Sequence, residues 1–97
     1  MYYLTIDGMM SGTGIRDSVE GGYISPSVLG LSQGLQDRIT HWLTQYEEAH
    51  DRQYDDPQEV AELDTEGLSI VRIVRSELPE SKVNYFSSAK TMMMMTD

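Results

Sequence analysis

The chain has 97 residues, which is enough for one hydrophobic core and too few for two ordinary domains. It contains no cysteine, which excludes disulfide bonds, thiol catalysis and thiolate metal sites. Sixteen acidic and seven basic residues give a net charge of −9, a sign that disfavours binding to nucleic acid or to anionic membranes.

The first third of the chain is predicted to hold short strands joined by glycine-rich turns. Residues 2–6 are rich in aromatic and branched side chains, which is typical of a strand. Residues 15–19 and 23–25 flank Glu20-Gly21-Gly22, and this arrangement predicts a short β-hairpin.

A helix is predicted from Ser32, a favoured N-cap residue, to about Ala49. Its apolar residues recur at steps of three and four, which places them on one face. They are Leu35, Ile39, Trp42, Leu43, Tyr46 and Ala49.

A polar break separates this helix from a second helical region. Asp56-Pro57 is a good helix start, and Asp64-Thr65-Glu66 is another start only eight residues later. We therefore predict a short turn over 57–62 and a separate helix from about Thr65 to Leu78. The second helix is apolar around much of its circumference, so we expect it to be the most buried helix, lying across the sheet.

Residues 82–86 alternate between polar and apolar side chains and predict a closing strand. The methionine-rich residues 91–97 are predicted to form a flexible tail. Together these elements predict one α+β domain over residues 1–90. We expect a small three- or four-stranded, mainly antiparallel sheet with two helices packed on one face.

The N-terminal residues lack the basic region and the long apolar run of a signal peptide. No segment is long and apolar enough to span a bilayer. A cysteine-free chain also suits a reducing compartment, so we expect a cytoplasmic protein.

Two glycine-containing motifs resemble enzyme signatures but lack the required context. The segment 30–34 reads Gly-Leu-Ser-Gln-Gly, the pattern of a nucleophile elbow, but a short loop precedes it where that motif needs a buried strand. Ser32 is fully explained as a helix cap. The segment 12–14, Gly-Thr-Gly, lacks the lysine and the third glycine of a phosphate-binding loop.

Neither histidine has the spacing of a metal site. His41 and His50 lie nine residues apart, and the acids that follow His50 do not match a calcium-binding loop. We therefore predict no catalytic residue, no metal ion, no cofactor and no enzymatic activity.

Most of the net charge is concentrated in residues 47–66, where nine acids face one base, Arg52, for a local charge of −8. Such a segment attracts a basic partner at a raised, salt-sensitive association rate. It is equally compatible with a solvated helix surface, and charge statistics alone do not separate these two interpretations.

The second helical region begins with Leu63-Asp64-Thr65-Glu66-Gly67-Leu68 and ends with Glu77-Leu78-Pro79, and the strand Lys82-Val83-Asn84-Tyr85-Phe86 follows. This succession, over residues 60–87, resembles the C-terminal half of small bacterial immunity proteins. Such proteins protect cells against contact-dependent growth inhibition toxins and related polymorphic toxins. The resemblance implies a cytoplasmic protein that binds a cognate toxin domain and blocks its active site. Many of these toxins are nucleases with basic clefts.

The acidic segment suits a plug for such a cleft, because its carboxylates can take the place of phosphates. Tyr46 and Tyr54 are included as aromatic anchors, although a packing role suits each of them equally well. The predicted partner-binding residues are Tyr46, Glu47, Glu48, Asp51, Tyr54, Asp55, Asp56, Glu59 and Glu62. Reversing Asp55, Asp56 and Glu59 to lysine is expected to abolish binding. Unfolding of that variant would mean instead that these acids cap or brace a helix.

Three other functions fit parts of the sequence. An acidic nucleic-acid mimic that inhibits a DNA-binding or restriction enzyme would share the charge, but a compact acidic cluster favours a cleft plug. A small enzyme or metal-binding domain would need a bound ion or a buried carboxylate pair. A structural subunit would leave an exposed apolar patch. The sequence leaves the oligomeric state open.

Overall fold

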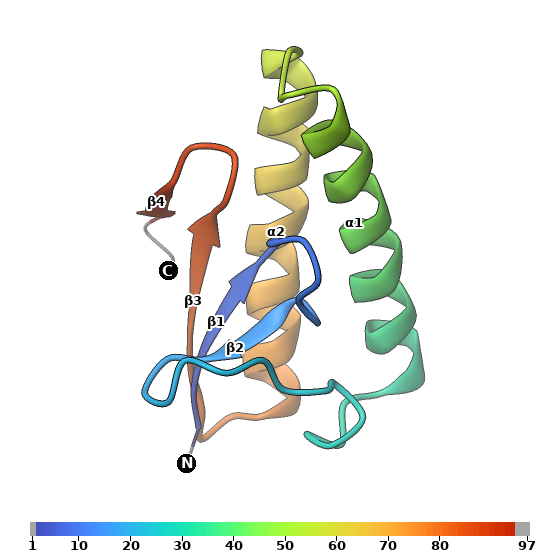
Figure 1. Ribbon diagram of the computed structural model, residues 1–97. Coiled ribbons are helices and arrows are strands. Elements are labelled where there is room, and N and C mark those ends of the chain that lie inside the picture. The colour runs from blue at the N-terminus through green and yellow to red at the C-terminus, as the bar shows by residue number, and fades with distance from the viewer. Residues whose placement is uncertain (1, 95–97) are drawn as a thin grey trace.

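The computed structural model describes residues 2–94, which form one layer of strands and one layer of helices (Figure 1). The elements follow in the order β1 (Tyr3–Asp7), β2 (Ile15–Asp17), α1 (Gln33–Asp51), α2 (Pro57–Glu77), β3 (Lys82–Ser87) and β4 (Met92–Met94). The predicted α+β fold, with both helices on one face of a four-stranded sheet, is confirmed.

The sheet has the strand order β2-β1-β3-β4. The outer pairs β1–β2 and β3–β4 are antiparallel, as predicted for most of the sheet. The central pair β1–β3 is parallel, with Thr5 opposite Asn84. A parallel pair needs a long crossover connection, and the segment that contains both helices provides it.

Alternation along the strands directs apolar side chains toward the helices. Leu4 and Ile6 of β1 and Val83 and Tyr85 of β3 are buried on this inner face. Helix α2 lies directly against β1 and β3, and α1 packs against α2 (Figure 1). The second helix lies directly on the sheet, as predicted, and it has seven buried residues against five in α1.

The expected hairpin around Gly21-Gly22 forms only in part. Strand β2 pairs mainly with β1, and the returning segment meets it in a single antiparallel bridge between Arg16 and Tyr23. The backbone N–H of Ile24 donates to the carbonyl of Ile15 over 2.9 Å. The sheet edge next to β2 is therefore covered by a turn and one bridge in place of a regular strand.

Helix α1 begins after Ser32, as predicted. The Ser32 Oγ accepts a hydrogen bond from the backbone N–H of Leu35 and donates one to Glu77 Oε2 at 2.6 Å. The Glu77 carboxylate also accepts from the backbone N–H of Ser32, at 2.6 Å. Ser32 is thus a cap that ties the start of α1 to the end of α2, and both roles of its hydroxyl are structural.

Helix α2 is continuous, and the prediction of a turn over 57–62 followed by a separate helix from Thr65 is wrong. The start at Asp56-Pro57 is real, because Asp56 Oδ1 accepts from the backbone N–H of Gln58 at 3.0 Å. Asp64 does not cap a second helix, since its carboxylate bonds side chains of β3. Thr65 Oγ1 donates to the carbonyl of Ala61, a bond typical of a helix interior.

The segment after β3 is attached to both helices. The hydroxyl of Tyr46 accepts from the backbone N–H of Ala89 at 2.9 Å, and Lys90 Nζ lies 3.4 Å from Asp64 Oδ2. Met92–Met94, which the sequence places in the tail, form β4 along β3. Residues 95–97 of that predicted tail lie outside the described residues. Neither described helix is long and apolar enough to cross a membrane.

Candidate partner-binding site

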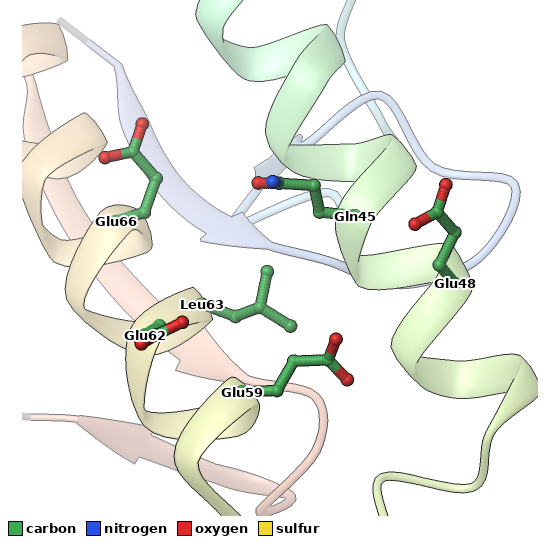
Figure 2. A pocket seen from close by; sticks show the side chains of 6 residues that line it. All are labelled: Gln45, Glu48, Glu59, Glu62, Leu63 and Glu66. Carbon is green, nitrogen blue, oxygen red and sulfur yellow. The ribbon is translucent and has the colours of Figure 1, made fainter. Parts of the chain in front are cut away.

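Acidic side chains of both helices meet in a groove near the loop that joins α1 to α2 (Figure 2). The two helices are adjacent in sequence and antiparallel, so the C-terminal half of α1 faces the N-terminal half of α2. The groove has a volume of about 160 Å³. It is lined by Gln45, Glu48, Glu59, Glu62, Leu63 and Glu66, and we call it the acidic groove.

The floor of the acidic groove is apolar and fixed. Leu63 lies between the glutamates in Figure 2, and it is 5% exposed. Its carbonyl accepts a hydrogen bond of 2.9 Å from the indole Nε1 of Trp42, which is itself buried. The two helices are therefore joined by a buried hydrogen bond directly beneath the groove, so the spacing of the glutamates on its walls is set by the core.

Two of the groove glutamates are neutralised by arginines of α1 and the following loop. Arg38 binds Glu66 in a bidentate manner, with Nε–Oε2 and Nη2–Oε1 distances of 2.6 and 2.8 Å. Arg52 pairs with Glu59. The hydrogen bond to Glu66 raises the pKa of Arg38, and the hydrogen bond to Glu59 raises the pKa of Arg52. These partly exposed pairs stabilise the fold only slightly, but they reduce the local negative charge.

The remaining charge of the acidic groove belongs to Glu48 of α1 and Glu62 of α2. Within the described chain, the Glu48 carboxylate makes no hydrogen bond and no ion pair. Glu62 accepts only a hydrogen bond of 3.2 Å from the side-chain amide of Gln58. Glu59 Oε1 is buried and has no hydrogen-bond donor among residues 2–94, so it is closed to a partner. Glu48 and Glu62 are exposed, and their carboxylates are the ones that a donor from a partner can reach.

The structure brings only part of the predicted site together. Glu48, Glu59 and Glu62 line the groove, whereas Glu47, Asp51 and Asp55 are exposed outside it. Gln45, Leu63 and Glu66 line it although they were not predicted. Spacing provides a signal for Glu66, because positions 59, 62 and 66 share one face of a continuous helix. The assumed break in the helix hid that relationship.

The two predicted anchors differ in exposure. Tyr46 is fully buried, with its ring 5.4 Å from that of Trp42. Its position therefore fits a packing residue and not an exposed aromatic anchor. Tyr54 is half-buried in the loop, 6.0 Å from the Tyr46 ring and 5.7 Å from the His50 ring. Asp56 serves as the cap of α2. Only Tyr54 therefore presents aromatic surface beside the exposed acids.

Asp64 is the one acid of the segment 47–66 that is directed toward the sheet. It is 2% exposed, and it accepts hydrogen bonds from Tyr85 Oη at 2.6 Å and Ser87 Oγ at 3.0 Å. Burial, together with the hydrogen bond to Asp64, raises the pKa of Tyr85. Lys90 provides the countercharge. Asp64 therefore links α2 to β3 and is not available to a partner.

The remaining candidate motifs have structural roles. Gly14 adopts a φ of 92°, and Thr13 Oγ1 donates to the carbonyl of Ile24 at 2.6 Å, so the Gly-Thr-Gly segment is a turn. His50 Nδ1 lies 3.3 Å from the hydroxyl of Tyr54. Across residues 2–94, no three histidine, aspartate or glutamate side chains are grouped as metal ligands.

The chain is therefore a two-layer α+β domain with an acidic groove on its surface. A family model described as Serratia CdiI immunity protein-like matches residues 4–88, which is most of the chain. The protein belongs to this family. Neither a curated protein nor a solved structure matches the chain.

Family membership confirms the resemblance found in residues 60–87 and extends it to β1. The protein is an immunity protein of the contact-dependent growth inhibition type, a class whose partner is a cognate toxin. Membership also favours inhibition by binding over enzymatic activity.

Proposed function

We propose that this immunity protein neutralises a nuclease toxin, an RNase, by seating its acidic groove in the basic active-site cleft. The proposal places the inhibition in the cytoplasm, where a delivered toxin meets its substrate. One observation carries it: Glu48 of α1 and Glu62 of α2 line the groove, and neither carboxylate forms an ion pair with a base among the described residues, although Arg52 attracts Glu48 from a longer distance. A nuclease cleft must offer basic side chains to phosphates, and carboxylates bind the same side chains.

The size of the groove supports an amino-acid side chain as its occupant. Small-molecule sites usually have volumes of roughly 300–1,000 Å³, whereas this groove has about 160 Å³. A lysine or arginine that enters it can pack its aliphatic stem on Leu63 and reach the carboxylates with its charged end. Such an arrangement combines apolar contact with charge-assisted hydrogen bonds, which an acidic rim alone does not provide.

The experiment uses the toxin domain encoded next to this gene. Cells that express the toxin receive the wild-type protein or the variant Glu48→Lys/Glu62→Lys, and survival is measured. A matched control, Glu20→Lys/Glu80→Lys, changes the net charge equally at exposed acids outside the groove. We expect the control to protect and the groove variant to fail while remaining folded. Equal protection by both variants would refute the groove as the inhibitory surface.

The nucleic-acid mimic is not proposed as the function. Mimicry needs charges spread along a face, and here the arginine pairs of Glu59 and Glu66 interrupt such a series. Capture of a DNA-binding enzyme in place of a toxin would favour mimicry.

A further inference from the structure

The face of the sheet that the helices leave uncovered carries an arginine paired with a buried acid. Side chains that alternate with the buried inner ones point to this open face. Figure 1 shows both helices on the opposite side. The strand residues on this face, which we call the open face, are Tyr3, Thr5, Asp7, Arg16, Lys82, Asn84, Phe86 and Met93. Thr5 and Asp7 are buried beneath their neighbours.

Arg16 is oriented by an acid behind it and a ring beneath it. Its Nε lies 3.4 Å from Asp7 Oδ2, and its guanidinium carbon lies 5.9 Å from the centre of the Phe86 ring. Asp7 is 1% exposed, and its Oδ1 accepts from the Tyr23 hydroxyl at 2.8 Å and from the Met9 N–H at 3.2 Å. The buried acid therefore accepts two hydrogen bonds through Oδ1, and its Oδ2 forms an ion pair with Arg16 without a hydrogen bond.

The outer end of Arg16 is available to a ligand. Its side chain is 34% exposed, and its terminal amino groups donate no hydrogen bond to residues 2–94. A guanidinium held in this way presents paired N–H donors, the geometry that suits a carboxylate.

The composition of the open face differs from that of the rest of this acidic protein. Asp7 is the only acid among its described strand positions, and that acid is already covered by Arg16. Tyr3 and Met93 are about half exposed, at 46% and 50%, and Lys82 is exposed nearby. Tyrosine, phenylalanine, methionine and arginine are enriched in protein interfaces. The face is mildly basic and apolar, whereas the acidic groove is negative.

We propose that the open face is a second contact for the same toxin and that Arg16 binds a carboxylate of an acidic toxin segment. The inference rests on the proposed function, because the partner is the toxin. Charge complementarity selects the occupant: an acidic segment is repelled by the groove and attracted by Arg16 and Lys82. A partner that carries a basic cleft and an adjacent acidic segment fits both surfaces.

The two surfaces lie close enough for one partner to reach both. Strands β1 and β3 end near the turn that Tyr46 of α1 and Asp64 of α2 hold in place. In Figure 1 the ends of these strands point toward the end of the molecule where α1 passes into α2. The longest extent of the protein is 37 Å, so an interface that extends from one surface to the other has ordinary dimensions.

The test measures the dissociation constant of the toxin domain with three variants. The double variant Asp7→Asn/Arg16→Gln removes both charges together, so no buried carboxylate is left without its countercharge. Lys82→Glu reverses an exposed charge of the same face without touching the buried cluster. The control, Arg72→Gln, removes an exposed arginine of α2, on the other side of the sheet. We expect about tenfold weaker binding or more for the double variant, a smaller loss for Lys82→Glu and no change for the control.

The outcomes separate this inference from the groove proposal when Glu48→Lys/Glu62→Lys is measured in the same assay. Wild-type affinity for Lys82→Glu and the double variant, with a loss for the groove variant, overturns the second contact and leaves the groove. The reverse result supports the second contact and refutes the groove. If the double variant fails to fold, Lys82→Glu alone decides. If these variants change the oligomeric state of the protein in solution and leave its affinity for the toxin unchanged, the open face is a self-association surface. That result would overturn the inference.

Discussion

The ring of Tyr85 in β3 fills the space that a side chain at Gly67 of α2 would occupy. A Cβ atom at residue 67 would lie 2.2 Å from Cε1 and 2.8 Å from the hydroxyl oxygen of Tyr85. The missing side chain lets the helix approach the sheet closely enough for Tyr85 to donate to Asp64, one turn earlier in the helix. The pair therefore sets the distance between the two layers beside the acidic groove.

We predict that Gly67→Ala destabilises the protein by about 1–3 kcal/mol, because the added methyl group displaces a buried ring. The control is Gly34→Ala in α1, where no atom lies within 4 Å of an added Cβ. Alanine favours a helix over glycine by up to about 1 kcal/mol, so this variant should be neutral or more stable. Urea unfolding of both variants measures the difference. Equal stability of Gly67→Ala and wild type would show that the layers are not closely packed here.

A second prediction concerns the buried carboxylate of Asp64. Asp64→Ala leaves the hydroxyls of Tyr85 and Ser87 without their acceptor, which is expected to cost about 1–3 kcal/mol. Asp51→Ala removes an exposed acid of α1 and should change the free energy of unfolding by only a few tenths of a kcal/mol. Thermal unfolding of the two variants gives the comparison. A small effect at Asp64 would mean that water replaces the lost acceptor.

Local signals in the sequence were sufficient for the ends of the helices. Ser32, Asp56-Pro57 and Pro79 act on the backbone within a few residues, so their roles can be read without knowing the fold. Asp64-Thr65-Glu66 has the same kind of letters but a different role, because the partner of Asp64 lies twenty-one residues away on β3. Local sequence does not reveal such a partner, and one helix was therefore predicted as two.

Prediction of the candidate site was limited in the same way, because partners that are distant in sequence cannot be recognised from local patterns. Charge clustering identified the acidic segment, because it depends on composition alone. It did not show that Asp56 is a cap or that arginines pair with Glu59 and Glu66. Tyr46 lies on the apolar stripe predicted for α1, and this stripe was the better guide to its buried position. The parallel pairing of β1 and β3 depends on the path of the whole chain, which periodicity does not specify.

The capping role of Asp56 and the pairing of Glu59 with Arg52 change the expected effect of reversing Asp55, Asp56 and Glu59 to lysine. The triple variant loses the cap of α2 and the Arg52–Glu59 pair, so we now expect it to be less stable by about 1–2 kcal/mol as well as deficient in binding. Glu48→Lys/Glu62→Lys keeps the Asp56 cap and both members of the Arg52–Glu59 pair, and it removes only the weaker attraction of Glu48 for Arg52. Comparing the midpoints of thermal unfolding for the two variants separates folding from binding. A triple variant as stable as the wild type would contradict the capping role of Asp56.

A fourth prediction uses the pH dependence of Tyr23. Burial and the hydrogen bond to Asp7 raise the pKa of Tyr23 to about 12 from 10.0. The folded state therefore holds this proton more tightly than the unfolded state. The associated stability is complete below pH 10 and is lost as the pH rises through about 12.

The measurement compares wild type with Tyr23→Phe. The free energy of unfolding of the wild type should fall more steeply than that of the variant over this alkaline range. Identical slopes would mean that the Tyr23 hydroxyl is not held by Asp7, and the orientation of Arg16 would lose part of its support.

The central claim is that the acidic groove occupies the cleft in which the toxin binds its substrate. The most direct measurement is a competition experiment, in which a labelled, non-cleavable RNA is bound to the toxin domain and this protein is added. We predict that the RNA is displaced in proportion to the protein bound and that Glu48→Lys/Glu62→Lys weakens this displacement. A stable ternary complex of toxin, RNA and immunity protein would contradict it, because inhibition would then act from outside the cleft.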